Sequence, residues 1–134
     1  GTVSLLAPAI AGGNTVILLV SGCQPLSAIS LAEVIHSSDV PGGVVNILTG
    51  TQEELAPVAA AHMDINALVY AGGQADLLRE IQLKAAANVK RIIPCDISNW
   101  RSAEAQGPYF ILDTQEIKTT WHPIENTGGA GAKY

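Results

Sequence analysis

The feature that most restricts the fold is a pair of short apolar runs separated by one amphipathic stretch. The runs are Thr15 to Val20 (TVILLV) and Val44 to Leu48 (VVNIL), and turns rich in glycine and proline bound the stretch between them. That stretch predicts a helix that begins after Pro25 and turns Leu26, Ile29, Val34 and Ile35 inward. A strand, a crossover helix and a strand within about thirty residues form a βαβ unit, whose two strands are parallel and buried.

The segments on either side continue the same alternation. An apolar helix is expected before the first run, over Leu5 to Ala11. After the second run we expect a helix to about His62, a strand over Ile65 to Tyr70, a helix over Gln74 to Ala87 and a strand over Val89 to Ile93. Alternating helices and strands predict an α/β fold with an open, mostly parallel sheet of Rossmann-like type and helices on both of its faces.

For two of these helices the sequence also predicts the residues at the ends and on the inner face. The spacing Thr51-Gln52-Glu53-Glu54 predicts a capping box at the start of the helix that ends near His62. Its inner face is expected to be Leu55, Val58 and Ala59, with a kink at Pro57. The helix over Gln74 to Ala87 should turn inward Leu77, Leu78, Ile81 and Ala85 and stop at Asn88.

The pattern changes after residue 95. Asp96 to Pro108 is polar and predicts a loop or a short helical turn. Tyr109 to Leu112 (YFIL) is strand-like, and Glu116 to Trp121 (EIKTTW) alternates as a weaker strand. The glycine-rich tail from Glu125 to Tyr134 is expected to be disordered. We therefore divide the chain into residues 1–108, a terminal strand segment at 109–124 and a flexible tail at 125–134.

Composition narrows the class of partner. The 134 residues suit one domain, and only 14% of them are charged against 48% that are apolar. A net charge of -5 with scattered Lys and Arg argues against nucleic acid as a partner. No apolar run is long enough to span a membrane. Two cysteines without metal-ligand spacing predict free thiols in a reducing compartment, and hence a cytoplasmic protein.

The order of several motifs resembles the cofactor domain of the NAD(P)-dependent aldehyde dehydrogenases. Over about fifty residues the resemblance rests on Leu6-Ala7-Pro8-Ala9, Gly13-Asn14-Thr15-Val16, Pro25-Leu26-Ser27-Ala28 and the run Pro41 to Gly50. It continues more loosely through Val69 to Gly73, Asn88 to Arg91 and on to Cys95, and Gln115 to Trp121 is similar to the terminal strand that serves oligomerisation in that family. With its Trp121-x-Pro123 ending, the chain is most similar to the non-catalytic C-terminal half of the family-16 aldehyde dehydrogenases.

The chain departs from that family at its functional positions. Where the family carries a Lys and a Glu that hold the adenosine ribose, this sequence reads Leu19-Val20-Ser21-Gly22. The family's Phe-Thr-Gly-Ser turn, which meets the pyrophosphate, reads Tyr70-Ala71-Gly72-Gly73. In that family the general-base Glu follows this strand, and ungapped counting places Cys95 at its position, with Asp96 next. The domain that bears the nucleophilic Cys would fall between Pro108 and Asp113, where the chain has no room for it.

Two positions remain as candidates for chemistry. Gly72 and Gly73 lie between a strand and a helix, where backbone N–H groups could hold the phosphate of a weakly bound NAD(P), although a glycine pair is also simply a tight turn. Cys95 follows a strand at its carboxyl end, where open sheets place their ligands, and it is the one candidate catalytic residue. An ordinary structural cysteine is the alternative, because a reactive thiol needs a base or a cation beside it.

The other reactive side chains have simpler explanations. Cys23, in the turn after the first strand, is interpreted as structural. The three histidines, His36, His62 and His122, are far apart and lack a carboxylate cluster, so no metal site is predicted.

Two hypotheses follow for function. The first is a non-catalytic module that self-associates or docks on an aldehyde-dehydrogenase-like partner through Tyr109 to Trp121, closing an exposed sheet edge. The second is a nucleotide-binding oxidoreductase domain that works only within a larger assembly. Aldehyde oxidation by this chain alone is not expected, because a thiohemiacetal-forming Cys is missing from the family's position.

Overall fold

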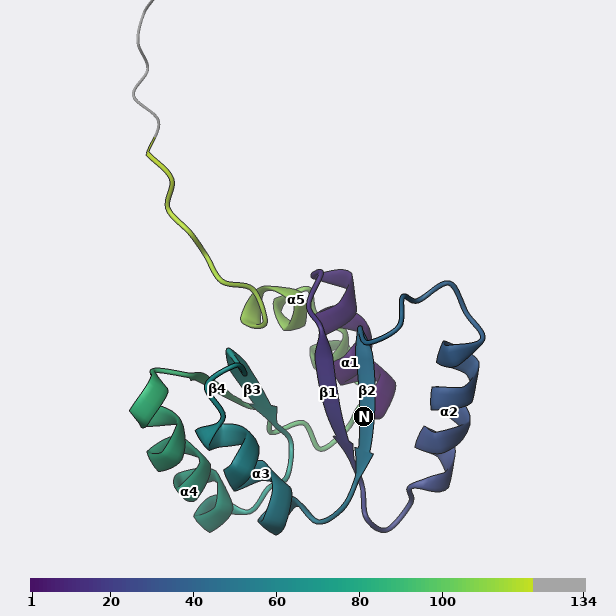
Figure 1. The fold of residues 1–134 in the computed structure, drawn as a ribbon, viewed down its shortest axis with the longest axis horizontal. Helices are drawn as coiled ribbons and strands as arrows, with labels where there is room; N and C mark the ends of the chain where they lie inside the picture. The colour runs from purple at the N-terminus through teal and green to yellow at the C-terminus, as the bar shows by residue number, and fades with distance from the viewer. Residues whose placement is uncertain (122–134) are drawn as a thin grey trace, which may run out of the picture.

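A computed structural model of the chain describes residues 1–121 (Figure 1). Helices and strands alternate along it as the sequence predicts. They are α1 (Thr2–Ala11), β1 (Val16–Val20), α2 (Leu26–His36), β2 (Val45–Thr49), α3 (Gln52–Ala61), β3 (Ala67–Tyr70), α4 (Ala75–Ala85), η1 (Ala86–Asn88), β4 (Arg91–Pro94), η2 (Ala103–Gln106) and α5 (Tyr109–Asp113). The predicted tail at 125–134 lies outside the described residues. Within residues 1–121 no helix combines the length and the apolar character needed to cross a membrane.

The strands pair in parallel, which confirms the predicted βαβ unit. In the first pair Val16 of β1 lies opposite Val45 of β2, and in the second pair Ala67 of β3 lies opposite Arg91 of β4. The expectation of one continuous sheet is wrong for residues 1–121, which form two separate two-stranded sheets. Because β1 and β3 are not hydrogen-bonded to each other, each keeps one edge without a ladder partner.

The predicted terminal strand is also wrong. Tyr109 to Leu112 belongs to the helix α5, and Glu116 to Trp121 has no regular structure. Pro108 is the N-cap of α5, and its φ of -69° already has the helical value just before the apolar residues. The segment after α5 has strand-like composition but meets no strand edge within the described chain, and a lone strand has nothing to hydrogen-bond.

The inner face of α2 differs from the predicted one. Leu26, Ile29 and Val34 are exposed, by 80%, 41% and 64% of their surfaces, whereas Ala28 is buried. The residues of α2 that are least exposed are those at positions 28, 31, 32 and 35. Of these, only Ile35 was predicted to face inward. The helix itself carries apolar side chains on nearly every face, so the spacing of these residues does not determine which face is buried.

The face of α3 is shifted by one residue from the prediction. Ala56, Pro57 and Ala60 are buried, while Val58 is exposed, and Pro57 lies within a continuous helix. Thr51 is the N-cap as expected, but its side chain makes no capping hydrogen bond, so the capping box does not form.

The predicted face of α4 is confirmed. Leu77, Ile81 and Ala85 are buried, and Leu78 packs against the core. The main hydrophobic cluster joins α3, β3 and α4 and consists of Ala56, Ala60, Tyr70, Leu77 and Ile81. The core therefore lies in the half of the molecule built from the second strand pair.

Candidate functional site

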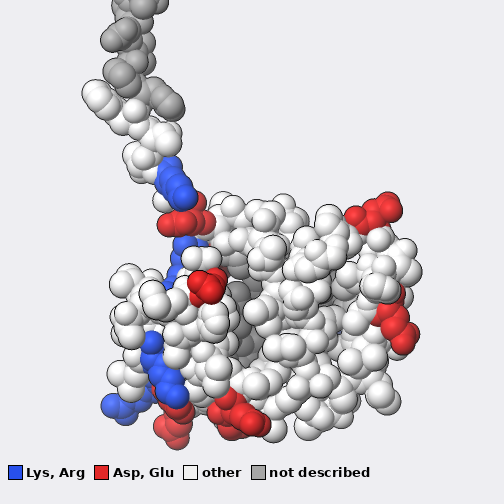
Figure 2. Space-filling view, in the orientation of Figure 1, with Lys and Arg blue, Asp and Glu red and all other residues white. Residues whose placement is uncertain are grey.

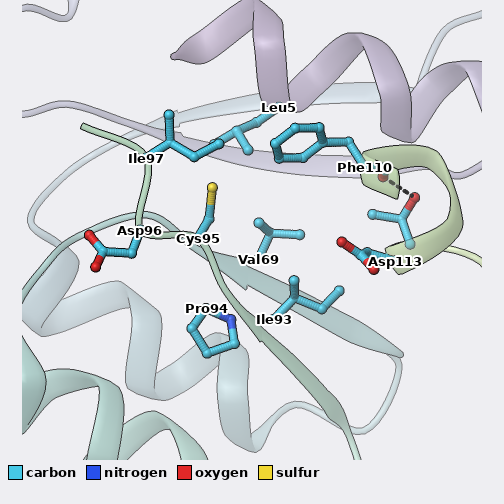
Figure 3. Close-up of a pocket in the computed structure, with 10 residues that line it drawn as sticks. Leu5, Val69, Ile93, Pro94, Cys95, Asp96, Ile97, Phe110 and Asp113 are labelled. Carbon is cyan, nitrogen blue, oxygen red and sulfur yellow. Dashed lines mark hydrogen bonds between the residues drawn. The ribbon is translucent and has the colours of Figure 1, made fainter. Parts of the chain in front are cut away.

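A cavity of about 200 Å³ lies between α1, the ends of β3 and β4, and α5 (Figure 3). Its walls are largely apolar and include Leu5, Val69, Ile93 and Phe110. Its polar side chains include the Cys95 thiol and the carboxylates of Asp96 and Asp113. Among the described residues no Lys, Arg or His lines the cavity, so this part of the chain supplies it with neither a general base of the histidine type nor a cation.

Cys95 is placed as the sequence predicts, directly after β4. Its backbone N–H donates to the carbonyl of Tyr70 at 2.8 Å, and its sulfur points into the cavity (Figure 3). Burial raises the pKa of the Cys95 thiol, the backbone N–H of Ile97 partly offsets this by a hydrogen bond, and the negative charges of Asp96 and Asp113 raise the pKa further. A raised pKa favours the protonated thiol, which is a poor nucleophile.

The contribution of α5 to the cavity could not be read from the sequence. Phe110 and Asp113 come from a segment expected to be a strand, and Pro108 followed by an apolar run was the one signal for a helix there. The end of α5 is tied to the first half of the chain by Gln115, whose side-chain amide donates to the carbonyl of Gly12 at 2.7 Å. Arg91 also donates to the carbonyl oxygens of Asp113 and Gln115.

The Gly72-Gly73 turn and Cys95 lie at the same end of the second sheet, because Tyr70 and Pro94 are register partners at the carboxyl ends of β3 and β4. Gly73 has a φ of +59°, which favours glycine, and a Cβ on Gly72 would collide with the Tyr70 ring. The predicted strand–turn–helix geometry is thus present. Whether the two glycines bind a cofactor stays a prediction.

The charges at this turn are negative. Gln74, the N-cap of α4, donates its side-chain amide to the Glu53 carboxylate at 2.9 Å, and Asp76 lies in the first turn of α4. A hydrogen bond to a backbone group and the one from Gln74 lower the pKa of Glu53. These carboxylates already complement the positive end of the helix dipole, which weakens the attraction for a phosphate.

The other cysteine and the histidines do not come together in a common site within residues 1–121. Cys23 is exposed in the turn after β1, His36 ends α2, and His62 is the C-cap of α3. His122 lies outside the described residues. Across residues 1–121 no three His, Cys, Asp or Glu side chains are grouped closely enough to hold a metal ion.

Known proteins are similar to this chain over about two thirds of its length. Residues 2–94 match the aldehyde dehydrogenase family. The mitochondrial aldehyde dehydrogenase of Leishmania tarentolae is 36% identical over 87 residues, and the NADP/NAD-dependent aldehyde dehydrogenase PuuC of Escherichia coli is 37% identical over 87 residues. Each of these alignments covers 65% of this chain and 18% of the relative.

A solved structure agrees with the fold. The crystal structure of an aldehyde dehydrogenase from Bartonella henselae superposes with a TM-score of 0.62 at 28% sequence identity, covering 66% of this chain and 18% of that one. The aligned part thus spans about a fifth of the length of these relatives. On the family match over residues 2–94, the chain belongs to the aldehyde dehydrogenase family.

Proposed function

We propose that this chain is a non-catalytic member of the family that acts by self-association or by docking on an aldehyde-dehydrogenase-like partner. The contact surface is the segment from Tyr109 to Trp121. The observation that carries the proposal is the exposure of large apolar side chains along this segment, with Tyr109 70%, Ile117 88% and Trp121 85% exposed. Such side chains are typical of the centre of a protein–protein interface.

The state of the candidate chemical groups supports a role without catalysis. Burial raises the pKa of the Cys95 thiol, and within residues 1–121 no Lys, Arg or His lines its cavity to activate it. The ribose-holding Lys and Glu of the resembled family are replaced at Leu19 to Gly22. The loss of these groups agrees with the resemblance of the chain to the non-catalytic C-terminal half of the family-16 aldehyde dehydrogenases.

Light scattering coupled to size-exclusion chromatography tests the docking proposal. We expect the mass of the chain to rise above 13.9 kDa with concentration, and replacing both Ile117 and Trp121 by Ser to keep the chain monomeric. Lys118→Ser is the matched control, since it alters the same segment without removing apolar surface. Where the chain alone is monomeric, the same two variants are compared for binding to purified PuuC. A chain that neither associates nor binds, or equal behaviour of both variants, would contradict the proposal.

A second candidate function is nucleotide binding within a larger oxidoreductase assembly. The observation in its favour is the Gly72-Gly73 turn, which has a positive φ at Gly73 and lies just before α4, since a helix N-terminus can bind an anion through its backbone N–H groups. Against it stand the carboxylates of Glu53 and Asp76 at the same turn.

Calorimetric titration with NAD and NADP up to millimolar concentration tests the second candidate. If the turn binds a dinucleotide, heat is saturable and Gly73→Asp abolishes it. Gly43→Asp is the matched control, because Gly43 also has a positive φ, of +86°, but lies in the loop before β2. The absence of heat and of thermal stabilisation would remove the case for a cofactor.

A further inference from the structure

The cavity at the ends of β3 and β4 combines apolar walls with a charged group at its mouth. Its walls come from three separate elements, with Leu5 on α1, Val69 on β3 and Phe110 on α5. In Figure 3 the carboxylate of Asp113 points toward these apolar side chains, and Asp113 is itself an exposed residue. A side chain that lines a cavity and also meets solvent stands at the opening, so this apolar space ends at a negative charge.

The second carboxylate of the cavity wall has a different orientation. Figure 3 shows the side chain of Asp96 directed away from the sulfur of Cys95. Asp113 therefore supplies the carboxylate that faces the apolar space. The two aspartates carry the same charge in the same wall, and they differ in where that charge points.

The Asp113 carboxylate takes part in no ion pair within residues 1–121. The ion pairs of this part of the chain use the carboxylates of Glu80 and Glu116 instead. Arg91 reaches the same residue, but its guanidinium donates to the main-chain carbonyls of Asp113 and Gln115. The charge of Asp113 is therefore available to a ligand.

The surroundings of the cavity favour a cation over an anion. Residues 1–78, which include the walls on α1 and β3, contain no Lys or Arg. In Figure 2, Lys and Arg lie along the side of α4 and β4 and in the segment after α5. The hydroxyl of Thr114, which also lines the cavity, is within hydrogen-bond distance of the carbonyls of Phe110 and Ile111. An anion would thus meet a carboxylate and an occupied hydroxyl.

We propose that this cavity binds a small alkylammonium ion, with its hydrocarbon chain between the apolar walls and its ammonium group at the mouth beside Asp113. The proposal goes beyond the docking function, because it requires no second protein. The volume of about 200 Å³ is sufficient, since a cavity of about 150 Å³ holds benzene and n-butylammonium is of similar size. The ammonium group stays at the solvent edge, so it avoids most of the cost of burying a charge.

The mouth of the cavity is held in place without a ligand. The side-chain amide of Gln115 donates to the carbonyl of Gly12 at 2.7 Å, which ties the end of α5 to α1. Arg91 ties the same end of α5 to β4 through its contacts with main-chain carbonyls. Because these contacts fix the residue that carries the charge, a ligand does not have to order it on binding.

NMR titration of the isotope-labelled chain with three probes of equal length tests the proposal. The probes are n-butylammonium chloride, n-butanol and sodium butyrate. We expect saturable amide shifts with butylammonium, largest around Cys95 and Phe110, with a Kd on the order of a millimolar. Butanol should bind about fivefold more weakly, because it lacks the attraction to the carboxylate, and butyrate more weakly still.

Asp113→Asn should lower the affinity for butylammonium to that for butanol and leave butanol binding unchanged. Asp96→Asn is the matched control, since it removes an equal charge from the same wall but from a side chain directed away from the thiol. It should keep the preference for butylammonium. Both positions are exposed, so both variants are expected to fold.

A second readout is the protection of the Cys95 thiol. In a Cys23→Ser chain, butylammonium should slow alkylation of Cys95 by iodoacetamide, because ligand and thiol share the cavity, whereas butyrate should not. Equal butylammonium affinity in the Asp113→Asn and unaltered chains would overturn the proposal. Shifts without saturation, or binding that leaves Cys95 unprotected, would also overturn it. None of these outcomes touches the docking function, which concerns the exposed segment from Tyr109 to Trp121.

Discussion

The ammonium nitrogen of Lys90 lies 2.7 Å from the carbonyl oxygen of His62, the C-cap residue of α3. It also donates to the carbonyls of Ala59 at 2.7 Å and Ala60 at 2.9 Å, so all three of its protons have acceptors. The residue is only 8% exposed, and desolvation by this burial lowers the pKa of Lys90. A cation at a helix C-terminus satisfies carbonyls that the helix cannot and complements its dipole.

Lys90→Met should destabilise the fold by about 2–3 kcal/mol, because three carbonyls would lose a charged donor in a buried site. Chemical denaturation measures this loss. Lys84→Met is the control, since Lys84 forms an exposed pair with Glu80 at 3.0 Å, and it should cost about 0.5 kcal/mol or less. Equal losses in the two variants would show that the Lys90 contacts do not hold the end of α3.

Cys95 should resist alkylation until the pH rises above the ordinary range of cysteine, because burial disfavours its thiolate. In a Cys23→Ser chain, the rate of reaction with iodoacetamide, followed by mass spectrometry, should have its midpoint above about pH 8.5. The same chain in guanidinium chloride is the control and should return to that value. A native midpoint at or below it would contradict the assignment of a neutral thiol.

The same shift has a consequence for stability. Because the folded thiol keeps its proton where the unfolded thiol loses it, the unfolding free energy should fall as pH rises above the ordinary cysteine pKa. Cys95→Ser should remove this part of the decline. Urea melts of the two proteins at pH 7 and pH 9.5 measure the difference.

Ile81→Ala should destabilise the chain by about 2–5 kcal/mol, since Ile81 is fully buried in the cluster with Tyr70 and Leu77. Leu83→Ala on the same helix is the control. Leu83 is 69% exposed, so its truncation should change the unfolding free energy by about 0.5 kcal/mol or less. A small effect at Ile81 would mean that the α3–β3–α4 cluster is not the core.

Arg91→Ala should loosen α5, because Arg91 donates to carbonyls at the end of that helix. Faster chymotryptic cleavage at Tyr109 and Phe110 is the expected result. Arg79→Ala, at an exposed position of α4, should leave the cleavage rate unchanged. If both variants are cut at the same rate as the unaltered chain, the Arg91 contacts do not hold α5 in place.

Local sequence patterns were sufficient for the alternation of helices and strands. The runs at Thr15 to Val20 and Val44 to Leu48 are apolar, bounded by turns and joined by one helix, so short-range information defines β1, α2 and β2. The face of α4 was also predictable, since Leu77, Ile81 and Ala85 stand out among polar neighbours. In α2 and α3 small and large apolar residues alternate around the helix, and tertiary packing selected Ala28 and Ala56 instead of the larger side chains.

The features that could not be predicted depend on contacts between distant segments. Glu116 to Trp121 has the composition of a strand, but a strand forms only where it pairs with a sheet edge, and this segment meets none within the described chain. Cys95 was placed correctly at the end of β4, while Phe110 and Asp113 reach its cavity through a loop whose path the sequence does not encode locally.

The position of the hydrophobic cluster predicts that the two halves of the molecule differ in local stability. All of its members lie in α3, β3 and α4, whereas the buried residue of α2 is Ala28. Amide hydrogens of α4 should therefore exchange with solvent only when the whole domain opens, and those of α2 should exchange through local opening at far lower free energy. A denaturant concentration that melts α2 should leave α4 folded, so one melting temperature will not describe the whole chain.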